Sequence, residues 1–263
     1  MGRLEGKTAI VTGATRGMGE AIARMFALEG AKVIMTGRDE PVLTESCNAI
    51  QALGGDAAAI LADVKCEDDW DRVMEFAHKK YGPVNVLVNN AGFVLHTNLD
   101  TFNLDAYREV MDVNCFGSMI GMTRVIPDMK KLGGGSIINS SSLAAVTQFG
   151  GPCAYLASKC AIHGITLAAA YEYGKHNIRV NVIVPGIVKT NLSQIVHDPE
   201  HHITKMFQSG HALPYLGEPE DAGHLCIYLA SDESRYVTGA EMRFDGGYSL
   251  TGFKHEMSEV SLA

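Results

Sequence analysis

Tyr155 and Lys159 are the pair in this sequence whose types and spacing could do acid–base chemistry. They lie four positions apart in the run 154–159, AYLASK, so on a helix they share one face. A free phenol has a pKa near ~10, and a nearby ammonium is expected to favour the phenolate and pull that pKa toward working pH. Such a phenol can donate or accept a proton. Most pairs at this spacing belong to solvated helix surfaces, so the assignment needs further residues.

A glycine-rich segment, TGATRGMG at 12–19, follows the first expected strand and opens the first expected helix. Glycines let the backbone approach a pyrophosphate, and a helix N-terminus offers free N–H donors and a favourable dipole. An ordinary strand-to-helix turn is the alternative interpretation. The strand–turn–helix context favours the phosphate-binding one.

The end of the second expected strand, at Thr36, Gly37 and Arg38, predicts which nicotinamide cofactor binds. A carboxylate at this place bonds the ribose 2′-OH of NAD, whereas an arginine accommodates the 2′-phosphate of NADP. Gly37 occupies the place, Arg38 follows it, and Arg16 in the glycine segment could converge on the same dianion. The alternative is that both arginines are solvated surface. We predict NADP(H) as the cofactor.

Seven short β-branched runs alternate with helical patterns and predict the elements that hold these residues. The runs span 8–11, 32–35, 58–61, 84–88, 136–139, 179–184 and 241–244. Their near-continuous apolar character predicts strands buried on both faces. Between the first two, Met18, Ile22, Met25 and Phe26 lie on one helix face, and Gly30 is placed to end the helix. Alternating strands and helices predict an α/β fold with a doubly wound, parallel, seven-stranded sheet, the Rossmann fold.

The chain length and composition are consistent with one domain over residues 1–263. A chain of 263 residues with 46% hydrophobic and 20% charged residues can bury a large core. The segment at about 191–216 breaks the strand–helix rhythm by mixing His, Pro and Gly with apolar residues. We expect it to be an insertion after the sixth strand that covers the substrate.

Net charge, cysteine content and the absence of targeting segments indicate which partners and which location to expect. A net charge of −8 argues against nucleic acid or an anionic membrane, each of which needs a basic face. Six cysteines are scattered without a CxxC pair, which fits reduced thiols. The N-terminus has no apolar signal core, and no run reaches the ~18 apolar residues of a membrane helix. We expect a cytoplasmic protein with no nucleic-acid or membrane partner.

With these elements placed, the chain resembles the classical short-chain dehydrogenases/reductases over nearly its whole length. The matching motifs are the glycine segment, Asp63-Val64, Asn89-Asn90-Ala91-Gly92, Val113-Asn114, the serines after the fifth strand, YLASK and Pro185-Gly186. The resemblance implies a tetrad of Asn114, Ser142, Tyr155 and Lys159. Ser140 to Ser142 run together where the family usually has a hydrophobic residue before two serines. The family's active serine lies 13 positions before the tyrosine, which selects Ser142.

The resemblance also implies what each residue does. Ser142 would hydrogen-bond the substrate oxygen, and Tyr155 would exchange the proton as hydride moves to or from the carbon. Lys159 would also bind the nicotinamide ribose, and Asn114 would hold a water that relays protons, with no metal needed. The implied cofactor contacts are Gly13, Thr15, Arg16, Gly17, Met18, Gly19, Arg38, Asp63, Val64, Asn90, Ala91, Gly92, Tyr155, Lys159, Pro185, Gly186, Val188 and Thr190.

Two other groups of residues have chemistry that we do not assign to function. A histidine-rich cluster could bind a metal, but a solvated loop is the preferred interpretation because the chemistry needs none. Cys153 and Cys160 flank Tyr155, and small buried cysteines are common enough to favour packing over a redox switch. The cluster comprises His197, Asp198, Glu200, His201 and His202.

The substrate is narrowed only by resemblance. Segments 120–122, 125–130 and 236–241, with the extension after Gly247, look like the bacterial hydroxysteroid dehydrogenases, so a steroid or bile acid is expected. A broad ketone/secondary-alcohol reductase is one alternative. Another is a 3-oxoacyl-carrier-protein reductase, for which Arg124, Lys130 and Lys131 could form a docking patch. A nucleotide-binding module without turnover is disfavoured by the tetrad. The family also implies a homo-oligomer, a tetramer.

Overall fold

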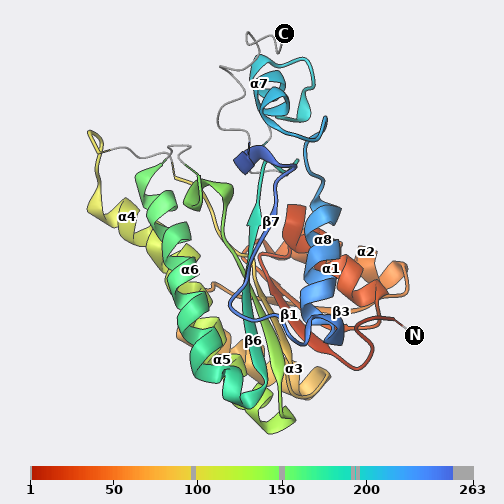
Figure 1. Ribbon diagram of the computed structural model, residues 1–263. Coiled ribbons are helices and arrows are strands. Elements are labelled where there is room, and N and C mark those ends of the chain that lie inside the picture. Colours follow the sequence, from red (N-terminus) through yellow and green to blue (C-terminus); the bar gives the residue numbers. More distant parts are fainter. Residues whose placement is uncertain (1, 96–98, 148–151, 191–192, 194–195, 251–263) are drawn as a thin grey trace.

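Seven parallel strands form one sheet in this chain. The computed structural model describes residues 2–95, 99–147, 152–190, 193 and 196–250 (Figure 1). The strands are β1 Thr8–Thr12, β2 Lys32–Gly37, β3 Asp56–Leu61, β4 Val86–Asn89, β5 Gly135–Ser140, β6 Ile178–Pro185 and β7 Glu241–Phe244. Their order is β3-β2-β1-β4-β5-β6-β7, with every pairing parallel. The predicted Rossmann-type sheet is confirmed.

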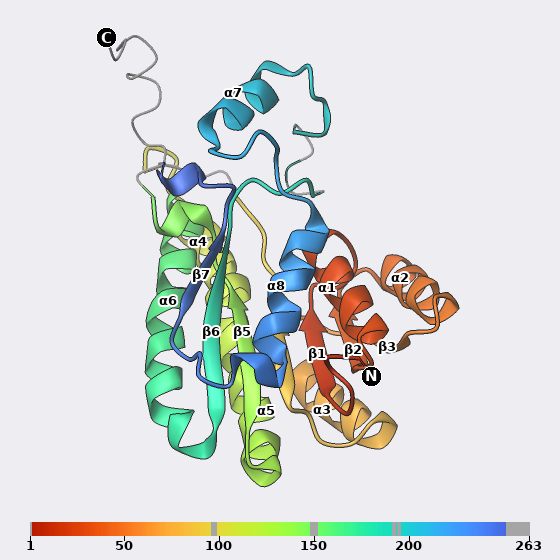
Figure 2. The ribbon, with the colours of Figure 1, turned by 45° about the vertical axis from the view of Figure 1, so that its right-hand side comes forward.

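Helices cover both faces of this sheet, as Figures 1 and 2 show. They are α1 Gly17–Leu28, α2 Glu40–Ala52, α3 Glu67–Lys80, α4 Leu104–Met111, α5 Gly117–Leu132, α6 Cys153–Tyr173, α7 His202–Gly210 and α8 Pro219–Ala230. Helices α1, α2 and α8 lie on one face, and α3, α5 and α6 lie on the other.

Each face of the sheet has its own apolar core because successive strand side chains point to opposite faces. Val11 packs with Phe26 of α1 on one face, while the neighbouring Ile10 packs with Trp70 of α3 and Val125 of α5 on the other. All five side chains are fully or almost fully buried. The continuous apolar runs predicted as strands are therefore runs that contribute to both cores.

Helix α1 ends as its sequence predicts. Gly30 has a φ of +90°, a left-handed conformation that glycine adopts without strain. Its N–H donates to the Ala27 carbonyl (3.1 Å), and the Ala31 N–H donates to the Phe26 carbonyl (3.0 Å). These bonds satisfy carbonyls in the last turn and direct the chain into β2.

Strand β4 differs from its predicted span of 84–88 and covers Val86–Asn89. Asn85 lies just before it and accepts the Thr8 N–H with its side-chain Oδ1 (3.0 Å). A side chain thus replaces a backbone acceptor at this end of the ladder. A pattern of apolar residues cannot show that a side chain takes the place of a backbone acceptor. The predicted start of the strand is therefore two residues early.

The switch in strand order falls between β1 and β4, where dinucleotides bind in folds of this kind. The glycine segment follows β1 and the Asn89–Gly92 segment follows β4, so both lie at the carboxyl edge of the sheet beside this switch. Sheet topology therefore brings together two motifs that are about 75 residues apart.

The segment 191–216 contains α7, which lies beyond the carboxyl edge of the sheet (Figures 1 and 2). The N–H groups of Ala212 and Leu213 donate to the Gly246 carbonyl, both at 2.9 Å, and tie the segment to the loop after β7. Asn191, Leu192, Gln194 and Ile195 lie outside the described residues, as does the C-terminal extension from residue 251. A substrate-covering role for this segment stays a prediction.

One stretch of the described residues, Cys153–His176, is long and apolar enough to match the composition of a membrane span. The stretch includes Ser158, Lys159 and His163, so it is not a continuous apolar run. Helix α6 forms most of the stretch and packs along β6, with Lys159 buried inside the molecule. Helices that pack against a buried sheet have the same composition.

Candidate active site

The glycine segment forms a tight loop between β1 and α1. Gly13 has a φ of +63°, and a Cβ atom there would lie 2.9 Å from the Ala91 Cα. A Cβ at Gly19 would lie 2.1 Å from the Gly13 carbonyl oxygen. Both positions therefore exclude side chains. Arg16 is the N-cap residue of α1 and makes no side-chain capping bond, so within the described structure the first N–H groups of α1 remain open to an anion.

The loop is held against the turn after β4 by a small polar network. Asn90 Nδ2 donates to the carbonyls of Thr12 (3.1 Å) and Gly13 (3.2 Å). The Thr12 hydroxyl in turn accepts the N–H groups of Asn90 and Ala91, both at 3.0 Å. Asn90 is thus a structural support for the glycine loop as well as a residue of the cavity wall.

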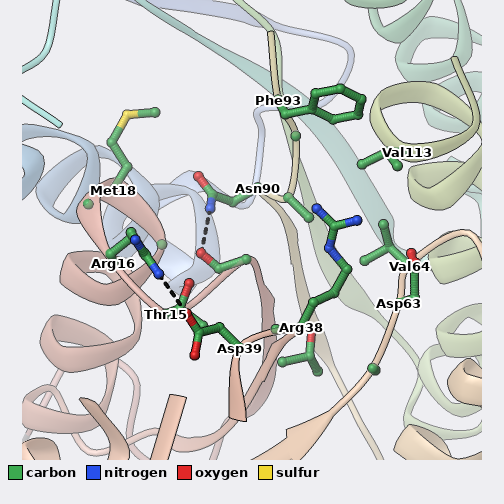
Figure 3. Close-up of a pocket in the computed structure, with 18 of the residues that line it drawn as sticks. Thr15, Arg16, Met18, Arg38, Asp39, Asp63, Val64, Asn90, Phe93 and Val113 are labelled. Carbon is green, nitrogen blue, oxygen red and sulfur yellow. Dashed lines mark hydrogen bonds and ion pairs between the residues drawn. The ribbon is translucent and has the colours of Figure 1, made fainter. Parts of the chain in front are cut away.

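A cavity of about 440 Å³ opens at this edge of the sheet (Figure 3). Most of the predicted cofactor residues line it, namely Gly13, Thr15, Arg16, Gly17, Met18, Gly19, Arg38, Asp63, Val64, Asn90, Ala91, Gly92 and Thr190. Pro185, Gly186 and Val188, with Tyr155 and Lys159, are not in its lining. Six further lining residues were not among the predicted cofactor contacts, although Thr36, Gly37 and Val113 belong to motifs noted in the sequence; the six are Thr36, Gly37, Asp39, Ala62, Phe93 and Val113. Several of these directly adjoin predicted positions, which is the signal that could have found them.

The two predicted phosphate-binding arginines do not converge in this structure. Arg38 points into the cavity, whereas Arg16 turns to Asp39, with its Nη2 2.9 Å from the Asp39 Oδ2 (Figure 3). Asp39 also caps α2 by accepting the Val42 N–H on Oδ1 (3.4 Å). Asp39 on the cavity wall holds Arg16 in this structure, so the expectation that Arg16 and Arg38 share one anion stays a prediction.

The three consecutive serines after β5 have different surroundings. The Ser140 carbonyl accepts a hydrogen bond from Lys159 Nζ (2.8 Å). The Ser141 hydroxyl is buried and contacts the Lys159 carbonyl (3.0 Å) and His163 Nε2 (2.8 Å). Ser142 is half-buried and hydrogen-bonds Tyr155. Ser142 is therefore the serine whose hydroxyl shares an environment with the tyrosine.

Burial sets the protonation of the Tyr155–Lys159 pair. Burial raises the pKa of Tyr155 above its usual value, and the hydrogen bond from Ser142 offsets only part of that rise. Burial also lowers the pKa of Lys159 to about 8. The Lys159 Nζ lies 5.8 Å from the centre of the Tyr155 ring. The expectation of a lowered tyrosine pKa is wrong for this structure, because loss of solvent has the largest effect on that pKa and raises it.

Asn114 lies in a π-helical turn, Asp112–Phe116, between α4 and α5. Its Nδ2 donates to the Phe93 carbonyl (3.0 Å) and to the Ser158 hydroxyl (3.0 Å), and its Oδ1 accepts the Phe93 N–H (3.0 Å). The side chain is thus committed to holding residue 93 in place. Turns of this kind are frequent at functional sites.

Gly92 connects the cavity to the tetrad. It lines the cavity, and a Cβ atom at this position would lie 3.1 Å from Asn114 Oδ1 and 3.3 Å from Lys159 Nζ. A side chain at residue 92 would crowd both polar groups. The cavity and the candidate catalytic residues therefore form one continuous site, and Lys159 is placed at their boundary.

The residues present fit a nicotinamide dinucleotide. Uncapped N–H groups at the start of α1 and glycines that permit close approach suit a pyrophosphate. An arginine on the cavity wall suits a further phosphate, and a buried lysine next to Gly92 suits a sugar hydroxyl. This set of donors accommodates an anionic dinucleotide along its length.

The histidine-rich cluster has no comparable arrangement. His197 Nε2 lies 3.1 Å from the Thr190 carbonyl, and the rings of His201 and His202 stack with their centres 4.6 Å apart. Among the described residues, no three His, Cys, Asp or Glu side chains gather as metal ligands would. The six cysteines, all of which are described, form no disulfide. That the chemistry needs no metal stays a prediction.

The fold and the site together define an α/β enzyme with a dinucleotide cavity next to a Tyr–Lys pair, in which Tyr155 is half-buried and Lys159 is buried. A family model described as Enoyl-(Acyl carrier protein) reductase matches residues 13–249. The chain is 39% identical over 255 residues to the 3-alpha-(or 20-beta)-hydroxysteroid dehydrogenase of Mycobacterium tuberculosis, covering 97% of this chain and 93% of that protein. It belongs to the short-chain dehydrogenase/reductase family and acts on alcohol or ketone substrates.

Two further comparisons agree with this assignment. The NADP-dependent (R)-specific alcohol dehydrogenase of Lentilactobacillus kefiri is 37% identical over 251 residues, which cover 94% of this chain and 98% of that one. The crystal structure of a short-chain type dehydrogenase/reductase from Mycobacterium marinum superposes with a TM-score of 0.87 at 30% identity, covering 94% and 96% of the two chains. The resemblance inferred from the motifs is confirmed.

Proposed function

We propose that this enzyme uses NADP(H) to interconvert a secondary alcohol and a ketone, with a hydroxysteroid or bile acid as substrate. The observation that carries the cofactor assignment is at Gly37. A Cβ there would lie 2.5 Å from Thr15 Cγ2, so a side chain at this position would have to displace Thr15, and glycine supplies no carboxylate to bind an NAD ribose. Arg38 follows and points into the cavity (Figure 3).

The tetrad residues would divide the proton chemistry between them. Bound NADPH supplies the hydride. The raised pKa of Tyr155 keeps its phenol protonated at neutral pH, so the group is ready to donate to a developing alkoxide. Ser142, hydrogen-bonded to Tyr155, would hold the substrate oxygen in reach of the same proton. In the oxidative direction Tyr155 must first lose that proton, which higher pH favours.

Lys159 and Asn114 would act on positions around the reacting atoms. Lys159 Nζ is fixed by the Ser140 carbonyl and lies next to Gly92 at the end of the cavity, where it would bind the nicotinamide ribose. Asn114 holds the Phe93 backbone through two hydrogen bonds and so shapes this end of the cavity. A relay of protons to solvent through a water at Asn114 is part of the proposal.

An apolar substrate is supported by the segment after β6. Met206, Leu213 and Tyr215 expose large apolar side chains there, beyond the carboxyl edge of the sheet. The relative from Mycobacterium tuberculosis carries hydroxysteroid dehydrogenase in its name, which agrees with an oxosteroid. A homotetramer and a cytoplasmic location belong to this proposal through the family resemblance alone.

A broad ketone reductase is the second candidate, supported by the Lentilactobacillus kefiri relative. The basic docking patch expected for a 3-oxoacyl-carrier-protein reductase is partly neutralised. Arg124 is paired with Glu67 and Asp71, both at 2.7 Å, and Lys130 lies 5.0 Å over the Tyr173 ring. These contacts leave less free positive charge for an acidic carrier protein.

The test is the oxidation of NADPH and of NADH with a panel of oxosteroids, oxo bile acids, small ketones and an acetoacetyl thioester. We expect NADPH to be preferred and an oxosteroid or oxo bile acid to have the highest kcat/KM. Preference for small ketones would favour the broad reductase, and activity on the thioester alone would favour fatty-acid synthesis. No oxidation with any carbonyl compound would contradict the proposal.

A further inference from the structure

His163 joins three elements around the active site, and the chemistry described above does not use it. It lies on α6, four residues after Lys159. Its Nε2 is 2.8 Å from the Ser141 hydroxyl at the end of β5, and its Nδ1 is 3.1 Å from Glu241 Oε2 at the start of β7. The His163 side chain is 19% exposed. The row of contacts from Ser141 through His163 to Glu241 leads from the interior toward the surface.

Ser141 is the link between this histidine and the candidate catalytic residues. Its buried hydroxyl also contacts the Lys159 carbonyl (3.0 Å). The carbonyl of the preceding residue, Ser140, accepts a hydrogen bond from the Lys159 ammonium (2.8 Å). The following residue, Ser142, hydrogen-bonds Tyr155. The backbone position of Ser141 therefore affects the hydrogen-bond partners of both Lys159 and Tyr155.

The protons in this chain are consistent with either charge state of His163. Glu241 can only accept, so Nδ1 carries a proton. When the ring is neutral, Nε2 accepts the single proton of the Ser141 hydroxyl, which then has no proton left to donate to the Lys159 carbonyl. When the ring is an imidazolium, Nε2 donates to Ser141, and Ser141 donates to the Lys159 carbonyl. The contact between β5, α6 and β7 thus persists in both states.

Three influences act on the protonation of His163. Burial lowers its pKa and has the largest effect, the Glu241 carboxylate raises it, and the Arg243 guanidinium lowers it. Arg243 is itself paired with Glu241 at 2.6 Å. The net lowering favours the neutral ring at neutral pH, in which Ser141 donates to Nε2.

We propose that His163 is a positioning residue that holds the Ser140–Ser142 segment against α6 through Ser141, with Glu241 fixing the orientation of its ring. This inference rests on the roles proposed above for Ser142, Tyr155 and Lys159. It predicts that the contact with Ser141 matters for turnover more than the contact with Glu241. A small displacement of this segment lengthens contacts to reacting groups and lowers kcat.

Three substitutions of His163 separate the two contacts. Gln reaches the place of Nε2 and can keep the Ser141 contact, Asn reaches the place of Nδ1 and can keep the Glu241 contact, and Phe keeps neither. We expect His163→Phe and His163→Asn to lower kcat about tenfold with KM within about twofold, and His163→Gln to stay near the parent enzyme. His224→Phe, an exposed histidine on α8, is the matched control.

Ser141→Ala completes a double-mutant cycle with His163→Phe. Each single change is expected to lower kcat, and the double variant should be no slower than the slower single one, because both remove the same contact. The pH profile is a further readout. If the Ser140–Ser142 segment shifts in His163→Phe or Ser141→Ala, the Ser140 carbonyl no longer stabilises the Lys159 ammonium. The fall of kcat at alkaline pH, near pH 8 in the parent, should then occur at lower pH.

Turnover is measured per NADPH-binding site, so that loss of folded protein is not read as loss of kcat. Additive effects in the double-mutant cycle, or an unchanged kcat per site in His163→Phe, would overturn the positioning role. Tyr155→Phe is assayed alongside. If it retains turnover, the proposed function fails. If it loses turnover while the His163 and Ser141 variants keep theirs, only the positioning role of His163 fails.

Discussion

Replacing the buried Lys159 with methionine should stabilise the cofactor-free enzyme at neutral pH while removing its activity. Burial lowers the pKa of Lys159 from its ordinary 10.5 to about 8. Because a tenfold change in proton affinity corresponds to about 1.4 kcal/mol, holding the ammonium in the fold opposes folding by about 3 kcal/mol at pH 7. Methionine has a similar length and carries no charge.

The pH dependence of this effect follows from linkage. Below pH 8 the folded and unfolded chains both hold the proton, so the opposing free energy is fully present. Between pH 8 and pH 10.5 the unfolded chain holds more protons, so the stability of the parent enzyme rises with pH relative to the variant. The Lys159 hydrogen bond to the Ser140 carbonyl favours the ammonium, so its loss in the variant offsets part of the gain, most strongly at the pH values where Lys159 is charged.

The assay is urea unfolding at equilibrium for the parent and Lys159→Met at one protein concentration, at pH 7, 8, 9 and 10. The difference in the free energy of unfolding between variant and parent should fall by about 2 to 3 kcal/mol from pH 7 to pH 10. Titrations of groups that Lys159 does not influence are common to both proteins and cancel, and the coupled Cys115 thiol is replaced by Ala in both proteins. A difference that is the same at every pH would refute the conclusion that Lys159 is held in a desolvated site.

Three further predictions concern the cofactor and pH. Replacing Arg38 with Asp and Arg16 with Ala should abolish the preference for NADPH, and an unchanged NADPH/NADH ratio of kcat/KM would refute the assignment. Replacing Asp39 with Ser keeps a helix N-cap but releases Arg16, so the NADPH preference should rise by about two- to fivefold; a falling ratio would show that the ion pair supports binding. Reductive turnover should decline as pH rises through about 8, where Lys159 loses its proton, while alcohol oxidation should increase as Tyr155 deprotonates. Parallel pH profiles in the two directions would contradict the pKa shifts of Lys159 and Tyr155.

The sheet was predictable because its strands are buried on both faces. Ile10 and Val11 are adjacent in sequence yet belong to different cores, and a continuous apolar run is what this arrangement requires. Gly13 was predictable for a related reason, since close approach to Ala91 leaves no room for a side chain. In both cases the fold allows only certain residue types, so the residue types in the sequence indicate the fold.

The features that were missed depend on orientation and burial. The spacing of Tyr155 and Lys159 predicts that they share a helix face, but it carries no information about loss of solvent, which sets the direction of the tyrosine pKa. The turn of Arg16 toward Asp39 is a choice of side-chain rotamer. The π-helical turn at Asn114 changes the backbone bonding without a distinct residue pattern.

The central claim is that Tyr155 transfers the proton in an alcohol–ketone interconversion. The most direct measurement compares Tyr155→Phe with the parent in NADPH binding and in turnover with the best oxosteroid of the panel. Tyr171→Phe is the control, because Tyr171 lies on the same helix and is 93% exposed. We predict unchanged NADPH affinity, a loss of turnover of about 10²- to 10⁴-fold in Tyr155→Phe, and no loss in Tyr171→Phe. Turnover near that of the parent in Tyr155→Phe would contradict the claim.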